Sequence, residues 1–244
     1  MPMFRRLLDG LTELIYPQVC LTCKVKLKDK PNIDGILCRE CWQRIKKNNP
    51  PFCRSCGRHL DKKYIAKNIC TPCLRKSQHF DRAFSPCKYE GITRDLIHEF
   101  KYKNKEYIGL TLGKLMVEFI KEYDLPVSDL DFIVPVPLHK TRLREREFNQ
   151  AEILSKPLEL TFGTPVMAGN LTRHRHTKTQ TGLENEKRFA NVKGSFSVKD
   201  KTSIKGKNIL LVDDVLTTSA TSSEAAYALK DAGAGIVFVL TLAS

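Results

Sequence analysis

Apolar residues in the last two thirds of the chain occur in short blocks that predict strands and helices in alternation. The blocks with the length and composition of buried strands are residues 83–89, 131–136, 208–212 and 236–242, with shorter β-like pieces at 166–167 and 195–198. Apolar residues at helical spacing cover residues 94–103, 107–123, 148–160 and 222–230. Strands that alternate with helices of this length predict an α/β fold, with a parallel sheet covered by helices on both faces.

The first 82 residues have a different pattern. A helical stripe of apolar residues runs through 1–16 and consists of Phe4, Leu7, Leu8, Leu11, Leu14 and Ile15. The stripe predicts an amphipathic helix packed on the protein, because it is too short and too charged for a signal peptide or a membrane span. Residues 17–82 are rich in Lys and in turn residues. We therefore expect two domains, residues 1–82 and 83–244, a linker near 80–90 and a cytoplasmic location.

Eight of the nine cysteines form four CxxC pairs, which are Cys20/Cys23, Cys38/Cys41, Cys53/Cys56 and Cys70/Cys73. Two such pairs complete a closed tetrahedral Cys₄ site, so the four pairs predict two structural zinc ions. Disulfides are the alternative, but a reducing cytoplasm disfavours them. We expect sequential pairing of the CxxC pairs on the two ions, with a cross-braced arrangement as the alternative. The remaining cysteine, Cys87, is predicted to be an ordinary buried thiol.

Positive charge is concentrated in the cysteine-rich region. Residues 1–88 carry 19 Lys+Arg and 7 Asp+Glu, a net charge of +12, whereas residues 89–244 carry 22 and 20, a net charge of +2. Eight thiolates with two Zn²⁺ would leave the first region near +8. A basic module of this kind commonly binds nucleic acid, although a lysine-rich surface that only keeps the protein in solution gives the same charge.

The segment 209–221 reads ILLVDDVLTTSAT and carries the clearest chemical signal. A short apolar strand ends in Asp213 and Asp214, a hydroxyl-rich turn follows, and a helix begins after it. Open parallel sheets bind ligands where a strand gives way to a helix, and the backbone N–H groups of a helix start can hold a phosphate. Two carboxylates can accept hydrogen bonds from vicinal hydroxyls. Together these features predict a site for a ribose 5-phosphate, whereas a buried strand and a capped helix alone leave the two acids unexplained.

This segment resembles the phosphoribosyl pyrophosphate (PRPP) motif of type I phosphoribosyltransferases, and the whole chain is similar to the competence protein F family. The resemblance covers nearly all 244 residues and is carried by the four CxxC pairs, VPVPLH, RLREREFNQA, TKTQTGL and ILLVDDVLTTSAT. It implies a type I phosphoribosyltransferase-like parallel sheet flanked by helices, preceded by a small Cys₄ zinc-binding module. Ser219 departs from the pattern, because the motif usually has glycine at this position, and a tight approach of the backbone to phosphate is in question there.

The resemblance also assigns roles to residues of the motif. Asp213 and Asp214 would contact the ribose hydroxyls directly or through water bound to Mg²⁺, and they are the predicted catalytic residues. Mg²⁺ is expected mainly on oxygens of PRPP, since this ion keeps its waters and uses few protein carboxylates. The residues expected to hold the 5-phosphate are Thr217, Thr218, Ser219, Ala220 and Thr221.

A second turn follows the predicted strand 131–136. It consists of Pro137, Leu138, His139 and Lys140, and its place matches the pyrophosphate-binding loop of the family. Arg142, Arg144 and Arg146 follow closely and can add positive charge. The alternative is a solvated basic helix start, paired with Glu145 and Glu147.

A third element, residues 173–191, is too polar for the core and long for a simple connection. It resembles the loop that closes over the substrate in glutamine amidophosphoribosyltransferase. Thr179, Gln180 and Arg188 are the substrate-binding positions that this resemblance implies, with Lys178 a weaker candidate. A lid that excludes water matters because PRPP otherwise hydrolyses. A disordered polar excursion is the alternative.

Two functions from different classes follow. The first is a PRPP-dependent phosphoribosyltransferase, a pentosyl-transfer enzyme that uses Mg-PRPP. The second is a non-catalytic single-stranded DNA-binding competence factor, in which PRPP is a regulator or absent. The family resemblance implies a role in DNA uptake and natural transformation, with single-stranded DNA and a DNA-uptake helicase as partners. The acceptor substrate and the oligomeric state are not encoded in any motif.

Overall fold

The computed structural model describes residues 18–28, 30–102, 105–175 and 185–244, with the backbone alone in 185–188. The amphipathic helix predicted for residues 1–16 lies outside these residues.

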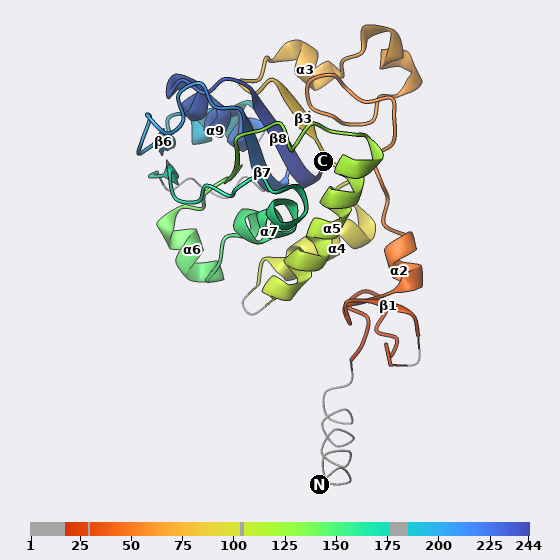
Figure 1. Ribbon diagram of the computed structural model, residues 1–244. Coiled ribbons are helices and arrows are strands. Elements are labelled where there is room, and N and C mark those ends of the chain that lie inside the picture. The colour runs from red at the N-terminus through yellow and green to blue at the C-terminus, as the bar shows by residue number, and fades with distance from the viewer. Residues whose placement is uncertain (1–17, 29, 103–104, 176–184) are drawn as a thin grey trace.

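A four-stranded parallel sheet forms the centre of the molecule (Figure 1), with the strand order β3-β8-β7-β4. The strands are β3 (Arg82–Phe84), β8 (Val237–Ala243), β7 (Ile209–Val215) and β4 (Phe132–Pro135). Ile133 and Val166 form a further parallel bridge beyond β4. The register pairs Pro135 with Val212, so β4 and β7 end next to each other at the same edge of the sheet.

Helices cover both faces of this sheet. On one face lie α4 (Gly91–Phe100), α5 (Glu106–Glu122) and α7 (Gln150–Phe162), and on the other lies α9 (Ala220–Asp231). Side chains of a strand point alternately to the two faces, which explains why β7 is apolar throughout its buried part. Leu210 and Val212 pack with α5 and α7, whereas Ile209 and Leu211 pack with α9.

Local sequence explains where α7 begins and ends. The Asn149 side chain accepts a hydrogen bond from Ala151 N at 3.1 Å, which caps the start of the helix. Gly163 ends it with φ of 73°, a left-handed conformation that favours glycine. Pro157 is tolerated inside α7, where its ring packs beside Gly113 of α5.

The predicted α/β fold is confirmed, and the long helices and buried strands lie close to their predicted places. The expected strand 83–89 is shorter, because Pro86 interrupts it after Phe84, although Cys87 still bridges to Ala243. The expected strand 208–212 continues through the two aspartates to Val215.

The β-like segment at 195–198 does not join the parallel sheet. It forms β6 (Phe196–Val198), which pairs antiparallel with β5 (Leu171–Arg173) as a separate two-stranded sheet. The helix α8 (Asn185–Val192) lies between these two strands in the sequence. The expectation that every strand alternates with a helix in one parallel sheet was therefore wrong for this region.

The cysteine-rich segment consists of short elements joined by turns. They are β1 (Asn32–Ile33), β2 (Leu37–Cys38), α2 (Arg39–Gln43), the 3₁₀ helix η1 (Lys62–Lys67) and α3 (Thr71–Arg75). We call residues 18–48 the first ribbon and residues 49–76 the second ribbon. Such small units bury little apolar surface by themselves and need another source of stability.

Both ribbons pack on the α/β core, and Phe52 of the second ribbon reaches the same helix, α5, as the first ribbon does. Cys20, Cys38 and Cys41 of the first ribbon belong to the core that contains α4, α5 and α7. Cys53 and Cys56 of the second ribbon belong to the core that contains α9. Part of the segment 80–90, where a linker is expected, forms β3, which pairs with β8 and donates from Ala83 N to Ser55 O of the second ribbon, and the division into two domains stays a prediction.

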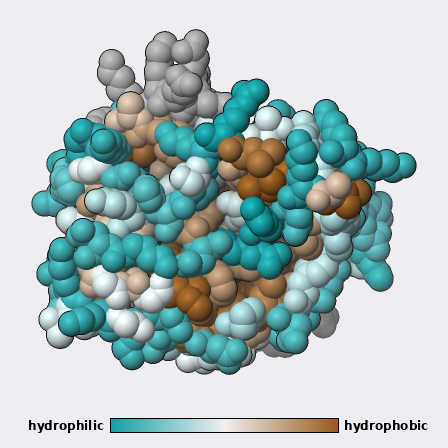
Figure 2. Space-filling model, turned by 90° about the horizontal axis from the view of Figure 1, so that it is seen from above, coloured by the Kyte–Doolittle hydropathy of each residue, from teal (hydrophilic) through white to brown (hydrophobic). Residues whose placement is uncertain are grey.

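The face seen in Figure 2 is mostly hydrophilic, with separate hydrophobic patches. Large apolar side chains that are exposed in the described residues include Ile65, Leu74, Tyr227 and Ile236. Within the same residues, none of the helices combines the length and the hydropathy that a membrane span requires.

Candidate functional site

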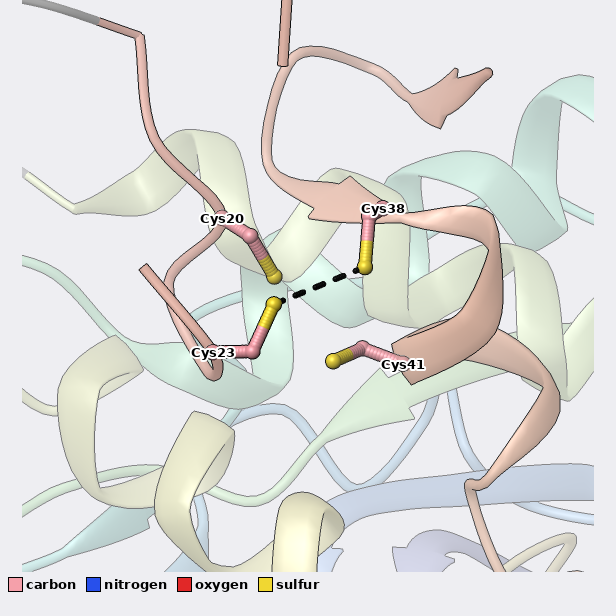
Figure 3. A group of neighbouring side chains, drawn as sticks. All are labelled: Cys20, Cys23, Cys38 and Cys41. Atoms are coloured by element: carbon pink, nitrogen blue, oxygen red, sulfur yellow. Dashed lines mark hydrogen bonds between the residues drawn. The ribbon is translucent and has the colours of Figure 1, made fainter. Parts of the chain in front are cut away.

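The four cysteines of the first ribbon meet at one point (Figure 3). Cys20 and Cys23 come from the turn before β1, Cys38 ends β2 and Cys41 lies in α2, and their sulfurs point toward one another. All four Sγ atoms lie within 4.8 Å of one another, and those of Cys23 and Cys38 are 3.7 Å apart. Zn–S bonds of about 2.3 Å in a tetrahedron place sulfurs about 3.8 Å apart. The residues present therefore fit a zinc ion.

The second ribbon repeats this arrangement. Cys53, Cys56, Cys70 and Cys73 also lie within 4.8 Å of one another, with 3.6 Å between the Sγ atoms of Cys56 and Cys70. The grouping is sequential, as expected, and the cross-braced alternative is excluded. Cys87 is fully buried apart from both groups, and burial raises the pKa of its thiol to about 12, as an inert structural cysteine requires.

The thiols of each group need a cation to ionise together. Burial and the neighbouring Cys38 raise the pKa of Cys41, and hydrogen bonding with Cys53 raises the pKa of Cys56. A divalent metal allows all four thiols of a group to ionise, because it binds thiolates and neutralises part of their charge. Both groups supply four protein ligands, so each site is closed and structural.

The second candidate site lies where β4 and β7 end. The chain turns toward α7 on one face after β4 and toward α9 on the opposite face after β7. Ligands of open α/β sheets bind at the carboxyl edge at such a switch point, and we call this edge between β4 and β7 the candidate crevice. The loops that border it are residues 136–139 and 216–219.

Asp213 and Asp214, near the end of β7, lie beside this crevice. Asp214 Oδ2 is 2.9 Å from Nζ of Lys101, and both side chains are largely buried. The backbone N–H of Asp214 donates to Oδ1 of Asp213 at 2.8 Å. Burial and the adjacent carboxylate of Asp214 raise the pKa of Asp213 to about 7. The acid pair is thus held at the edge of the sheet by one direct ion pair and one backbone donor.

Two further cations face the acid pair. Arg146 of α6 (Lys140–Arg146) interacts electrostatically with Asp214 and Asp213, and Arg173 at the end of β5 interacts with Asp213. Burial lowers the pKa of both guanidinium groups, and the carboxylates oppose that shift. Lys101, Arg146 and Arg173 therefore surround two acids from three separate elements.

The hydroxyl-rich segment forms the loop into α9, and we call residues 216–221 the phosphate loop. Ser219 is the N-cap of α9 and adopts φ of 66° and ψ of 3°. This left-handed conformation explains why glycine is usual at this position, because a side chain is strained there. The hydroxyl of Thr218 is buried without a hydrogen-bond partner in the described residues. A buried, unpartnered hydroxyl beside a helix N-terminus fits an anion such as phosphate.

The predicted pyrophosphate loop borders the same crevice. Pro137, Leu138 and His139 are partly exposed, and Lys140 begins α6 and is exposed. Nδ1 of His139 accepts a hydrogen bond from Thr141 N at 3.3 Å and so caps α6. The basic segment forms the helix α6, whose Arg146 interacts electrostatically with the acids, and the role of residues 137–140 toward pyrophosphate stays a prediction.

The predicted lid residues Thr179 and Gln180 lie outside the described residues, and so does the side chain of Arg188. Their roles stay predictions. The sequence reasoning missed Lys101 and Arg173 as parts of the site. A single lysine after an amphipathic helix and a single arginine in a short strand give no local signal.

The family model of the double zinc ribbon domain matches residues 11–74. Competence protein F of Haemophilus influenzae is 32% identical over 229 residues, which are 92% of this chain and 96% of that protein. The chain belongs to the competence protein F family. Its relatives include the DNA utilization protein YhgH of Escherichia coli K12, at 30% identity over 94% of this chain and 98% of that protein. Competence protein ComFC of Bacillus subtilis is 27% identical over 90% of this chain and 91% of that protein.

Solved structures that resemble this member of the competence protein F family are distant. The glutamine PRPP amidotransferase of B. subtilis has a TM-score of 0.36 and 21% identity, over 56% of this chain and 26% of that one. Adenine phosphoribosyltransferase of Leishmania donovani has a TM-score of 0.31 and 20% identity, over 53% of this chain and 51% of that one.

Replacing Ser219 by glycine should stabilise the protein. The left-handed conformation costs a side chain about 1–2 kcal/mol, and the flexibility of glycine in the unfolded chain offsets about 0.5–1 kcal/mol of the relief. Urea unfolding of the zinc-loaded protein should show a net gain of roughly 0.5–1 kcal/mol. Ser219→Ala is the control, since it also removes the hydroxyl but keeps the strain. An equal change in the free energy of unfolding in both variants would show that the backbone at residue 219 is not strained.

The stability of the protein should depend on pH through Asp213. Its pKa is raised to about 7 in the folded state from 3.8, so the folded protein binds an extra proton between these values. Wild-type stability therefore falls as pH rises through this window, and the Asp213→Asn variant lacks this loss. We expect Asp213→Asn to gain thermal stability relative to wild type as pH rises from about 5 to about 8. Asp231→Asn controls for the removal of one carboxylate. A pH-independent difference would contradict the raised pKa.

Proposed function

We propose that the protein binds Mg-PRPP at the crevice between β4 and β7 and transfers its phosphoribosyl group. One observation carries the proposal, namely an acid pair at the end of β7 next to a helix N-terminus with a buried, unpartnered Thr218 hydroxyl. A ribose 5-phosphate needs an acid pair and a helix N-terminus close to each other, because its hydroxyls require acceptors and its phosphate requires donors.

The charges around the crevice suit the reaction. A leaving pyrophosphate carries several negative charges while the sugar becomes oxocarbenium-like, and fixed charges stabilise such a transition state. Asp213 and Asp214 would face the ribose, whereas Lys101, Arg146 and Arg173 supply positive charge near it. Mg²⁺ bound to the substrate would neutralise part of the pyrophosphate. Thr217, Thr218, Ser219, Ala220 and Thr221 would hold the 5-phosphate, and residues 137–140 would face the pyrophosphate.

Calorimetry with Mg-PRPP tests the binding site. We expect wild type to bind in the micromolar-to-millimolar range that is common for enzyme substrates. The Asp213→Asn/Asp214→Asn double variant should lose this binding with its fold intact, because neutral amides accept ribose hydrogen bonds and metal-bound water poorly. Asp231→Asn/Asp81→Asn, a matched change of two surface carboxylates, should bind as wild type does. Unchanged affinity in the acid-pair variant would reject the assignment.

Pyrophosphate release separates catalysis from binding alone. Labelled PRPP, Mg²⁺ and the protein would be incubated with candidate bases or DNA oligomers. Release that depends on one acceptor supports a transferase, and binding without release under every condition supports PRPP as a regulator.

We further propose that single-stranded DNA is a partner of the ribbons, in keeping with a role in DNA uptake. Two observations favour it. The net charge of residues 1–88 is +12, and relatives of this chain are named competence and DNA utilization proteins. Basic surfaces bind nucleic acid chiefly through phosphates, which makes the affinity depend on salt. A DNA-uptake helicase is a further partner that this role would require.

Matched charge reversals test the location of DNA binding. Lys62, Lys63 and Lys67 are exposed on η1, and changing all three to Glu should weaken binding of single-stranded DNA strongly. For a single strand, each phosphate contact contributes about 0.7 to the slope of log affinity against log salt concentration. If the three lysines contact three phosphates, the magnitude of this slope should therefore fall by about 2. The control reverses Lys193, Lys199 and Lys205, which are exposed in the other domain. Equal weakening by the two triple variants would contradict DNA binding by the ribbons.

A further inference from the structure

Arg58 of the second ribbon reaches directly into the phosphate loop. Its Nη2 donates to the carbonyl oxygen of Leu216 at 2.6 Å and also to that of Thr217. These residues are separated by more than 150 positions in the sequence. The contact therefore joins the metal-binding region to the loop that precedes α9.

The geometry of the peptide bond gives this contact a consequence. A trans peptide is planar, and its C=O and N–H point in opposite directions. The carbonyl of Leu216 shares a peptide with the N–H of Thr217, and the carbonyl of Thr217 shares one with the N–H of Thr218. By holding both carbonyls on one side, Arg58 fixes both N–H groups on the other. A cationic donor at each carbonyl also polarises the peptide and strengthens its N–H as a donor.

The position of Arg58 is in turn fixed by the turn of residues 53–58, which we call the metal knuckle. The carbonyl of Arg58 accepts from Cys53 N at 2.7 Å, and the carbonyl of Cys53 accepts from Gly57 N at 2.9 Å. Gly57 has φ of 70°, and a Cβ there would come within 2.3 Å of the carbonyl oxygen of Ala83. The knuckle is thus pressed against β3, where Ser55 O accepts from Ala83 N at 2.7 Å. Cys53 and Cys56 bind the metal from within this turn.

A second contact ties the end of this region to α9. The backbone N–H of His79 donates to Oγ of Ser223 at 3.1 Å, and the His79 ring lies 5.0 Å from the ring of Tyr227. The first ribbon docks on α5, where Asp34 contacts Lys114 and Thr111, and Phe52 of the second ribbon packs on the same helix. The contact with the phosphate loop is made by Arg58 of the second ribbon.

We propose that Arg58 is a positioning residue of the phosphate loop, through which the second Cys₄ site orders the amides that receive the 5-phosphate. The proposal rests on PRPP as the ligand for its functional consequence, but the ordering of the loop by Arg58 is a property of the ligand-free protein. Arg58 acts through Leu216 and Thr217 and does not itself need to touch the substrate.

Hydrogen exchange of the full-length, zinc-loaded protein tests the ordering without ligand. Two hydrogen bonds from a charged group are lost in Arg58→Ala, so the hydrogen-bonded amides at the two ends of the loop, Leu216 N on Ala243 O and Ser223 N on Ser219 O, should exchange roughly 10- to 100-fold faster. Arg58→Lys, which keeps the charge on a side chain one atom shorter, should restore part of the protection. Arg54→Ala removes an exposed arginine from the same knuckle and should exchange as wild type does. Wild-type protection of the loop in Arg58→Ala would overturn the proposal.

Zinc content and far-UV circular dichroism would be measured for each variant. If Arg58→Ala loses zinc or its fold, Arg58→Gln decides, because its shorter neutral side chain cannot span both carbonyls. Faster exchange confined to the loop supports the proposal, and unchanged exchange overturns it. Wild type that binds no PRPP would instead refute the proposed function and leave the exchange result valid. Where wild type binds, Arg58→Ala should raise the Kd for Mg-PRPP roughly 10-fold or more.

The two metal sites can be compared in the same assay. Cys73→Ser removes a ligand of the second site, and Cys23→Ser removes one of the first. Loop exchange should rise in Cys73→Ser well beyond its rise in Cys23→Ser. An equal rise in both would contradict a specific link between the second site and the phosphate loop.

Discussion

The parallel pairing of β4 and β7 is the constraint on which the candidate crevice depends. Their register brings Pro135 beside Val212, so the loops that follow both strands leave the sheet at the same edge. Because the chain then turns to opposite faces, this edge is a switch point of the kind at which open α/β sheets bind ligands. The acids, the hydroxyls and the helix N–H groups come from the end of β7 and the start of α9, and the loop after β4, more than 70 positions away in the sequence, follows the neighbouring strand end.

Charge in this crevice is balanced across elements. Two carboxylates at the end of a buried strand are costly unless cations accompany them. Lys101 supplies a direct ion pair to Asp214, and Arg146 and Arg173 add positive charge from α6 and β5. The pKa of Asp213 is still raised to about 7, so Lys101 and Arg173 offset only part of the effect of burial and of Asp214. A site that keeps a carboxyl near neutrality in this way is typical of functional positions.

The two ribbons belong to the same two hydrophobic cores as the sheet and its helices. Their metal sites stabilise short elements that bury little apolar surface by themselves, and these elements pack on the α/β core. The first ribbon lies against α5 through Asp34, and the second lies against β3 and reaches the phosphate loop through Arg58. A segment that the sequence presents as a separate basic module therefore packs directly against the α/β core.

The sequence by itself determined the features that depend on local pattern. Pairs of cysteines two residues apart, apolar blocks of strand length and the Asp213-Asp214 segment before a hydroxyl-rich turn are all visible within short windows. The tertiary structure alone decided which distant side chains meet. Lys101, Arg173 and Arg58 carry no local signal, because their partners lie far away in the chain and the contacts arise only from the packing of the ribbons and helices on the sheet. It also decided that 195–198 pairs with 171–173 rather than with the parallel sheet, since strand pairing is a long-range choice that a short β-like segment cannot encode.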